Sequence, residues 1–226
     1  MRCVVTAGPT FEPLDQVRRL TNFSTGRLGT ELARYLAARG HDVTLLIGQQ
    51  AGAQVRLAQA AAQLGEHRIQ RVEIFSTTSD LSAKLAALAS EPIAAVFHAA
   101  AVSDFAFGKV WVRTPEGEFI EARRDKIPTE LGTVLAELVP TPKLIARLRE
   151  WFPNARLVGW KYEVEGTRAE ALKRAKQQID ECRTDACVAN GPAYGAGFGL
   201  VLATGQVAHL PGESELFERL EFLIRT

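Results

Sequence analysis

Short apolar runs alternate with amphipathic stretches along most of the chain. Cys3–Ala7 and Asp42–Ile47 are runs that predict strands, and the stretch Leu28–Ala38 between them predicts a helix that ends before Gly40. The alternation continues with a predicted helix at 53–64, a strand at 72–75, a helix at 80–89 and a strand at 93–98. Strands that are apolar on both faces are typical of a parallel sheet covered by helices on both sides.

The rhythm changes near the middle of the chain. Val110–Val112 and Phe119–Glu121 flank Pro115-Glu116-Gly117, which predicts a β-hairpin excursion at about 109–124. The alternation is then expected to resume with a strand at 134–139, a helix at 142–151, a strand at 157–162, a helix at 169–182, a strand at 186–189, a hairpin at 200–208 and a helix at 213–225. This pattern predicts a single α/β domain over residues 1–226, with a Rossmann-like, doubly wound, mostly parallel sheet.

Composition narrows the classes of partner. The 226 residues carry 27 Lys and Arg against 26 Asp and Glu, so a net charge of +1 predicts neither nucleic-acid nor membrane binding. The N-terminus has no secretory leader pattern, and the longest apolar stretch, 93–102, is too short to span a bilayer. Cys3, Cys182 and Cys187 form no CxxC pair, which favours buried thiols in a reducing compartment, the cytoplasm.

The first candidate site follows the first predicted strand. Residues 8–24 separate that strand from the next helix, whereas such loops usually span roughly 2 to 6 residues. The loop carries Asp15, Arg18, Arg19 and Asn22, and Ser24-Thr25-Gly26-Arg27 then opens the helix. Exposed N–H groups at a helix start can hold an anion, so the segment predicts a phosphate or carboxylate cradle. A capped helix start with packing glycines is the alternative.

An NAD(P)-dependent oxidoreductase of the short-chain type is a competing class. The first loop lacks the tight G-x-G-x-x-G turn, and Gly48-Gln49-Gln50 after the second strand offers no acidic residue for the ribose. No Tyr-x-x-x-Lys pair is present either. These observations disfavour a dehydrogenase.

Three further strand ends carry candidate chemistry. Asp104, after the alanines at 99–101, can accept hydrogen bonds from a base or hydroxyl or hold a metal through water, although helix caps and turns often contain such residues. Lys126, after the hairpin, can neutralise charge on a leaving pyrophosphate, unless the run 123–126 is only a solvated face. Trp160 can stack on a base and Lys161 can reach a phosphate, although a tryptophan at the edge of a core is common. His98 is interpreted as a core residue, and the histidines and cysteines show no metal-binding spacing, so no metal site is predicted.

These segments, taken in order, resemble the phosphopantothenoylcysteine synthetases, the ligases of coenzyme A biosynthesis. The resemblance lies in Val5–Thr10, Pro13, Val17-Arg18, Thr21–Gly29, Ala99–Phe105, Lys126-Ile127, Thr141–Lys143, Val158–Lys161 and Ala189-Asn190. It covers nearly the whole chain, and the length is similar to that of free-standing forms rather than of those fused to a flavin-dependent decarboxylase.

The resemblance implies a ligase that activates 4′-phosphopantothenate as an acyl-nucleotide and then joins it to cysteine. Asn22 matches the asparagine that holds the intermediate, Arg18 the basic residue beside it, and Lys126 the lysine needed to form it. The resemblance also implies a nucleotide pocket, formed by Gly8, Ser24, Thr25, Gly26, Arg27, Ala100, Ala101, Asp104, Phe105, Trp160 and Lys161. The alternative is a relative that binds nucleotide but has lost turnover.

Several positions depart from the family pattern. Pro128-Thr129 follow Lys126 where the fused bacterial forms have further lysines, and Trp160 replaces a phenylalanine. At Arg27 and Phe23 the sequence is more similar to the eukaryotic branch of the family, whose members use ATP. Bacterial members mostly use CTP. The expected co-substrate is therefore CTP or ATP with Mg²⁺. The resemblance also implies a homodimer. The excursion at 109–124, with Val110, Trp111 and Phe119, is the candidate to cross to the partner, because such apolar side chains need cover, and a flap packed on its own subunit is the alternative.

Overall fold

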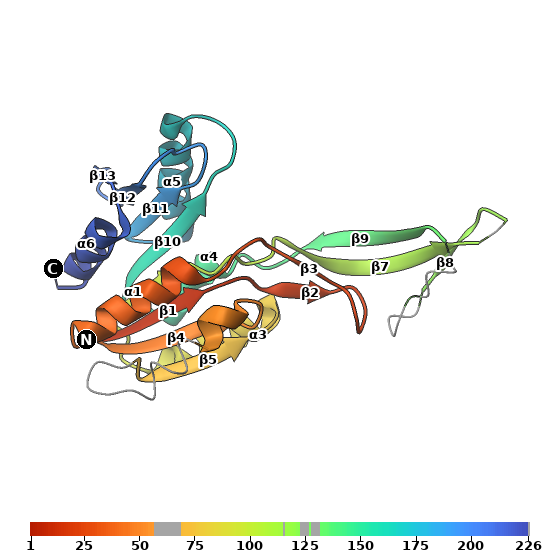
Figure 1. Cartoon of the computed structure of the whole chain (residues 1–226), viewed down its shortest axis with the longest axis horizontal. Coiled ribbons are helices and arrows are strands. Elements are labelled where there is room, and N and C mark those ends of the chain that lie inside the picture. Colours follow the sequence, from red (N-terminus) through yellow and green to blue (C-terminus); the bar gives the residue numbers. More distant parts are fainter. Residues whose placement is uncertain (57–68, 115, 123–126, 128–131, 226) are drawn as a thin grey trace.

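A mostly parallel sheet forms the centre of the molecule. The computed structural model describes residues 1–56, 69–114, 116–122, 127 and 132–225. Among these residues, eight strands form the main sheet in the order β13-β12-β11-β10-β6-β1-β4-β5 (Figure 1). From β5 to β11 the neighbouring strands are all parallel, and β12 and β13 add an antiparallel edge. This is the strand order of a doubly wound dinucleotide-binding sheet, which confirms the predicted fold class.

The strands of the main sheet match the predicted apolar runs closely. Their bounds are β1 (Arg2–Ala7), β4 (Asp42–Gly48), β5 (Arg71–Phe75), β6 (Ala95–His98), β10 (Arg156–Tyr162), β11 (Ala186–Asn190), β12 (Phe198–Leu202) and β13 (Val207–Leu210). All four residues of β6 are buried, as are all but the first residue of β1. Burial on both faces explains why these strands read as continuous apolar runs.

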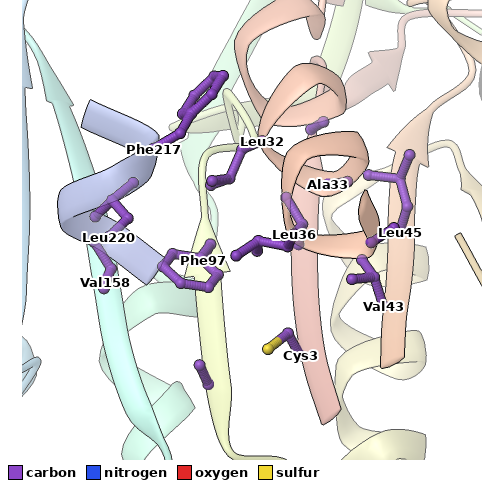
Figure 2. Packing of buried hydrophobic residues seen from close by; sticks show 14 of the residues in the cluster. Cys3, Leu32, Ala33, Leu36, Val43, Leu45, Phe97, Val158, Phe217 and Leu220 are labelled. Carbon is purple, nitrogen blue, oxygen red and sulfur yellow. The ribbon is translucent and has the colours of Figure 1, made fainter. Parts of the chain in front are cut away.

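Helices cover both faces of this sheet. The helical elements are α1 (Arg27–Ala38), α3 (Thr78–Ala87), the 3-10 turn η1 (Leu88–Ser90), α4 (Leu144–Trp151), α5 (Arg168–Cys182) and α6 (Glu213–Arg225). Leu32 of α1 and Leu220 of α6 pack with Phe97 on one face, as Figure 2 shows. Leu85 of α3 and Leu148 of α4 belong to the cluster on the opposite face. Residues 52–56 are helical, and the rest of the predicted helix at 53–64 lies outside the described residues.

The antiparallel excursion is longer than the sequence predicts. β7 (Phe105–Arg113) pairs with both β8 (Phe119–Glu121) and β9 (Val134–Pro140), and the three strands project from the main sheet as an arm (Figure 1). The prediction that 134–139 returns to the alternation of the main sheet is wrong, because β9 pairs with β7 instead. The excursion therefore spans Phe105–Pro140 rather than about 109–124. The apolar sequence of β9 indicated a strand but could not indicate its neighbours.

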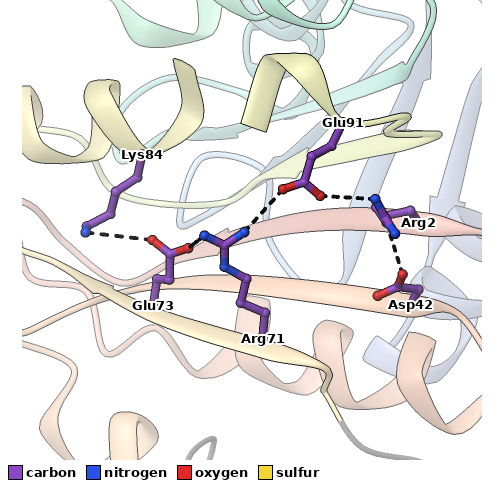
Figure 3. Close-up of polar contacts among 6 residues, drawn as sticks. All are labelled: Arg2, Asp42, Arg71, Glu73, Lys84 and Glu91. Atoms are coloured by element: carbon purple, nitrogen blue, oxygen red, sulfur yellow. Dashed lines mark hydrogen bonds and ion pairs between the residues drawn. The ribbon is translucent and has the colours of Figure 1, made fainter. Parts of the chain in front are cut away.

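A network of ion pairs links the amino ends of several strands, on the edge opposite the loops discussed below. Arg2 of β1 pairs with Asp42 at 3.0 Å and with Glu91 at 3.2 Å, and Glu91 also pairs with Arg71 at 3.2 Å (Figure 3). Arg71 also forms an ion pair with Glu73, and both residues belong to β5. The network connects segments that are distant in the sequence.

The buried cysteines fit their interpretation as core residues. Cys3, Cys182 and Cys187 are free thiols with at most 1% exposure. Burial raises the pKa of the Cys3 and Cys187 thiols to about 12. None of the helices in the described ranges combines the length and apolar character that a membrane span requires.

Candidate active site

The loops after β1 and β6 are bonded to each other where the strand order reverses. β1 lies between β4 and β6, so the crevice at their carboxyl ends is the switch point of the sheet, where such folds bind ligands. The backbone N–H of Thr10 donates to Ala101 O at 3.2 Å, and Ala101 N–H donates to Gly8 O at 3.0 Å. These bonds fix the predicted pocket residues Gly8 and Ala101 against each other.

Buried hydroxyl groups support this pair of loops. Thr10 Oγ1 accepts from the backbone N–H of Ser103 at 2.8 Å and lies 3.1 Å from Ser103 Oγ. Within β1, Thr6 Oγ1 accepts a hydrogen bond from the N–H of Ala100 at 3.1 Å. Thr6, Thr10 and Ser103 are not among the site residues predicted from the sequence. Thr6 lies near the end of β1, Thr10 and Ser103 lie in the loops, and all three stand within the segments Val5–Thr10 and Ala99–Phe105 that carry the resemblance.

His98 is a core residue behind the same loop. It is 6% exposed, and its Nδ1 lies 2.9 Å from Thr6 Oγ1. Burial lowers the pKa of the His98 imidazole to about 4, which keeps the ring neutral at physiological pH. This placement favours the interpretation of His98 as a satisfied core histidine.

Glycines allow α1 to begin in contact with the first loop. Gly26 has a φ of 71°, and a Cβ on it would lie 3.0 Å from Gly8 N. A Cβ on Gly29 would lie 2.7 Å from the Cβ of Ala7, closer than side chains pack. Only glycine fits this approach of helix to strand.

The start of α1 differs from the capped helix that the alternative interpretation requires. Gly26 is the N-cap, and among the described residues no side chain caps the helix by a hydrogen bond. Thr25 Oγ1 lies 3.4 Å from Arg27 N, a long contact, and Ser24 N–H donates to Asn22 O at 2.9 Å. Apart from this long contact at Arg27, no side chain among the described residues bonds the N–H groups of the first turn, and the anion cradle beside the Gly8 loop stays a prediction.

The long first loop contains a small hairpin that carries Asn22 to the switch point. β2 (Phe11–Pro13) pairs with β3 (Arg19–Thr21), and Asn22 follows β3 directly. Asn22 Nδ2 donates to Ala101 O at 3.3 Å and to Val102 O at 3.1 Å. The side chain is exposed. The structure thus brings Asn22, Gly8, Gly26 and Ala101 together from segments far apart in the sequence.

Arg18 forms an ion pair inside the same loop. Its guanidinium donates to Asp15 Oδ2 through Nε at 3.0 Å and through Nη2 at 2.5 Å. These bonds hold the pKa of the Asp15 carboxyl well below its ordinary range. Arg18 Nη2 also donates to the backbone O of Ile127 at 2.8 Å. Lys126, predicted to be catalytic, lies outside the described residues.

Arg27 is paired with a residue that the sequence analysis did not single out. Its Nη1 donates to Glu213 Oε2 at 2.9 Å, and its Nη2 bonds Glu213 Oε1, so the pair is bidentate. The hydrogen bond to Glu213 raises the pKa of the guanidinium. Glu213 begins α6, and 186 positions separate it from Arg27, so no local pattern could have indicated the contact.

Trp160 and Lys161 point to opposite faces of the sheet, as neighbours in a strand do. The Trp160 ring packs against the cluster shared by α1 and α6, and its Nε1 is buried with no hydrogen-bond partner among the described residues. Lys161 Nζ lies 3.4 Å from Glu163 Oε1, and Arg174 of α5 bonds the other oxygen of Glu163. The structure therefore does not bring Trp160 and Lys161 together at one point of the crevice.

Asp104 and Phe105 join the site to the arm. Asp104 is exposed after β6, and its backbone O accepts from Thr141 N–H at 2.9 Å. Phe105 is the first residue of β7 and pairs with Pro140. Within the described ranges, no group of three or more His, Cys, Asp or Glu side chains could hold a metal ion.

Comparison with known proteins gives a consistent result. The model of the family described as DFP, the DNA/pantothenate metabolism flavoprotein C-terminal domain, matches residues 1–219. The coenzyme A biosynthesis bifunctional protein CoaBC of Thermococcus kodakarensis is 32% identical over 225 residues, which are 97% of this chain and 49% of that protein. The chain thus spans about half the length of this curated relative.

Solved structures share the fold. The DNA/pantothenate metabolism flavoprotein from Streptococcus pneumoniae superposes with a TM-score of 0.81 at 23% identity, covering 100% of this chain and 98% of that one. A Cab2 mutant H337A in complex with phosphopantothenate-cysteine superposes with a TM-score of 0.73 at 19% identity, covering 99% and 86%. The family match confirms the resemblance drawn from the motifs, and the chain belongs to the DNA/pantothenate metabolism flavoprotein C-terminal domain family.

Proposed function

We propose that this protein is a phosphopantothenate–cysteine ligase that uses a nucleoside triphosphate. Membership of the family and the similarity to a CoaBC protein support the assignment. The observation that carries the assignment is the position of Asn22, whose side-chain amide donates hydrogen bonds to the carbonyls of Ala101 and Val102 at the switch point. Beside it, the uncapped first turn of α1 can receive a phosphate.

In the first step, a carboxylate oxygen of 4′-phosphopantothenate bonds to the α-phosphorus of the nucleotide. The bond between that phosphorus and the β-phosphate oxygen breaks, and pyrophosphate leaves. The reacting groups are all anionic, so the site must offer positive charge and N–H donors. Arg18 and the first turn of α1 are proposed to supply them, with Lys126 acting on the leaving pyrophosphate.

In the second step, the amine of cysteine attacks the acyl carbon of the mixed anhydride. The acyl–oxygen bond breaks, the nucleoside monophosphate leaves, and the amine loses a proton. A mixed anhydride is attacked readily by water, so it must be held in place until cysteine arrives. Asn22 is proposed to hold it by exchanging its hydrogen bonds to the carbonyls of Ala101 and Val102 for bonds to the anionic oxygens, because an amide donates without adding charge.

The nucleotide is proposed to be CTP or ATP, held with Mg²⁺ in the crevice formed by Gly8, Ser24–Arg27, Ala100, Ala101, Asp104 and Phe105. Triphosphate oxygens are the hard ligands that Mg²⁺ prefers, so the ion is expected to enter with the nucleotide. When bound, Mg²⁺ would offset the charge of the triphosphate. Arg27 is proposed to serve the nucleotide from its position beside Glu213, and Trp160 and Lys161 are proposed to act from separate faces.

A second copy of the chain is the proposed partner of the arm. Phe119 and Leu135 share one face of the arm and are each 47% exposed, and the arm extends away from its own sheet (Figure 1). Apolar surface of this kind requires cover, which an identical arm supplies by symmetry. Val110 is not part of this surface, since it is 1% exposed and packs with Val112 and Ile127. Val110 therefore does not need cover from a partner, and the crossing of the excursion to a second copy stays a proposal.

The reducing cytoplasm is the proposed location. Three free, buried thiols support it, because such cysteines persist unpaired where disulfides do not form.

Asn22→Asp tests the proposed role of the amide. The variant replaces a donor with a carboxylate, which repels the anionic intermediate, so we expect nucleotide binding to persist and turnover to fall by about 100-fold or more. The measurement is phosphopantothenate-dependent pyrophosphate release, with CTP and ATP compared. Asn154→Asp, at an exposed position after α4, makes the same chemical change away from the crevice. Equal rates in both variants would remove Asn22 from the mechanism.

Lys126→Gln tests the leaving-group step. We expect pyrophosphate release to be lost while nucleotide still binds. If pyrophosphate forms at the wild-type rate, the lysine is only a surface charge. Nucleotide binding by the wild type without any turnover would instead support a relative that has lost activity, and binding of a reduced nicotinamide would support an oxidoreductase.

A further inference from the structure

One buried carboxylate joins the first loop to the base of the arm. Asp15 is 6% exposed and accepts hydrogen bonds from five N–H groups of the described residues. Its Oδ1 accepts from the backbone N–H groups of Val17 at 2.9 Å and Arg18 at 2.7 Å. Its Oδ2 accepts from the Arg18 guanidinium and from the backbone N–H of Ile127 at 3.2 Å. The two oxygens therefore have different tasks: one closes a local turn, and the other bridges 112 positions of sequence.

Ile127 is fixed through both its backbone groups and its side chain. Its N–H donates to Asp15, and its O accepts from Arg18 Nη2 at 2.8 Å. Its side chain is buried with Val110 and Val112 of β7, against Leu14 of the loop. Ile127 directly follows Lys126 in the chain. The clamp formed by Asp15, Arg18 and Ile127 thus connects the loop that leads to Asn22 with the arm.

We propose that Asp15 is a positioning residue for the first half-reaction, because its Oδ2 orients Arg18 and fixes Ile127 relative to the crevice. This inference rests on the proposed ligase function. A turn alone needs only Oδ1, so the buried second oxygen and its cross-chain bonds are not explained by the turn. Small displacements of charged groups around a reacting phosphate cost much rate, whereas nucleotide binding is spread over many contacts. The expected defect therefore lies in kcat rather than in the KM for nucleotide.

Asp15→Asn separates the two tasks. An asparagine can keep an oxygen at the Oδ1 position for the turn, but it places an NH₂ group against the donors of Arg18 and Ile127. Asp15→Ser is a second variant that also keeps an acceptor for the turn and removes the bridge. Asp185→Asn is the matched control. Asp185 Oδ2 accepts from Arg149 Nη2 at 2.8 Å and from Leu157 N–H at 2.7 Å, the same type of bridge at the opposite edge of the sheet.

The measurements are steady-state pyrophosphate release and amide hydrogen exchange at Ile127 in the full-length protein. For both Asp15 variants we expect kcat to fall about 100-fold, with the nucleotide KM within about threefold of wild type. We also expect faster exchange at Ile127, while Asp185→Asn matches the wild type in kcat and in that exchange rate.

Three results would overturn the inference. They are unchanged kcat in the Asp15 variants, an equal loss of kcat in Asp185→Asn, and a defect confined to the nucleotide KM. In each case the wild type still turns over, so the proposed function stands. A wild type that releases no pyrophosphate would overturn the proposed function and, with it, this role for Asp15, even if exchange at Ile127 responded as expected.

Discussion

The main sheet and the arm are built from similar apolar strands but bury them differently. All four residues of β6 are buried between helices, whereas six of the seven residues of β9 are exposed. Among the described residues, the buried cluster of the arm consists of Val110, Val112 and Ile127. The difference teaches that an apolar strand becomes core only where another layer covers it. The arm is therefore expected to gain its cover from a second copy.

Truncation of a central side chain should produce the largest effect. Phe97 is fully buried in β6 between α1 and α6 (Figure 2), so Phe97→Ala should lower the free energy of unfolding by about 4 kcal/mol. Leu138→Ala in the arm, measured at a concentration where the protein is monomeric, should lower it by less than about 1 kcal/mol. Urea unfolding of both variants checks the contrast, and similar losses would mean that the arm is covered within one chain.

Acid should destabilise the main sheet through His98. Its pKa is about 4 in the folded protein, below the ordinary value of 6.5. Between these values the unfolded chain binds a proton that the folded protein does not, so stability falls as the pH decreases from about 6.5 to 4. Relative to His98→Gln, the wild type should lose about 3 kcal/mol more between pH 7 and pH 4. Parallel curves of unfolding free energy against pH for the two proteins would contradict the buried, neutral imidazole.

Charge on the arm should weaken association rather than folding. Trp111 and Leu135 lie opposite each other in the β7–β9 pair, so their side chains share one face. Phe119 lies on the same face, opposite Arg113, so Leu135→Lys together with Phe119→Glu should raise the dimer dissociation constant at least about 30-fold, equivalent to roughly 2 kcal/mol. Sedimentation velocity measures this change. A dimer of unchanged affinity would show that another surface joins the copies.

Ion pairs should contribute least, and more in the main sheet than in the arm. Glu91→Gln removes a carboxylate that pairs with both Arg2 and Arg71 (Figure 3) and should cost up to about 1 kcal/mol at low salt. Glu121→Gln removes the exposed pair with Lys109, 3.7 Å apart in the arm, and should change stability by less than about 0.3 kcal/mol. Thermal unfolding at low and high salt distinguishes the two, and a Glu121 effect as large as that of Glu91 would contradict the comparison.

The parallel strands and their helices could be predicted because burial dictates their composition. β1, β4 and β6 are covered on both faces, and each is a nearly uninterrupted apolar run. β9 has a similar composition, but it pairs with β7. The strand next to which β9 lies cannot be read from the local sequence. The hairpin of β2 and β3 was missed as well, because each strand has only three residues.

The site could be predicted in part. Asn22, Gly8, Gly26 and Ala101 meet as the motifs and the switch-point rule indicated, since the carboxyl ends of parallel strands share one edge. The ion pair of Arg27 with Glu213 and the bond from Asp15 to Ile127 depend on side chains that become neighbours only in the folded chain. The roles assigned to Lys126, Trp160 and Lys161 stay predictions.

The most direct test of the account couples the two half-reactions in the wild-type protein. The protein is incubated with Mg²⁺, 4′-phosphopantothenate and either CTP or ATP, and pyrophosphate, nucleoside monophosphate and phosphopantothenoylcysteine are followed with and without cysteine. The ligase account predicts that pyrophosphate release requires phosphopantothenate, and that addition of cysteine yields one nucleoside monophosphate for each amide formed. Nucleotide binding without phosphopantothenate-dependent pyrophosphate release would contradict it.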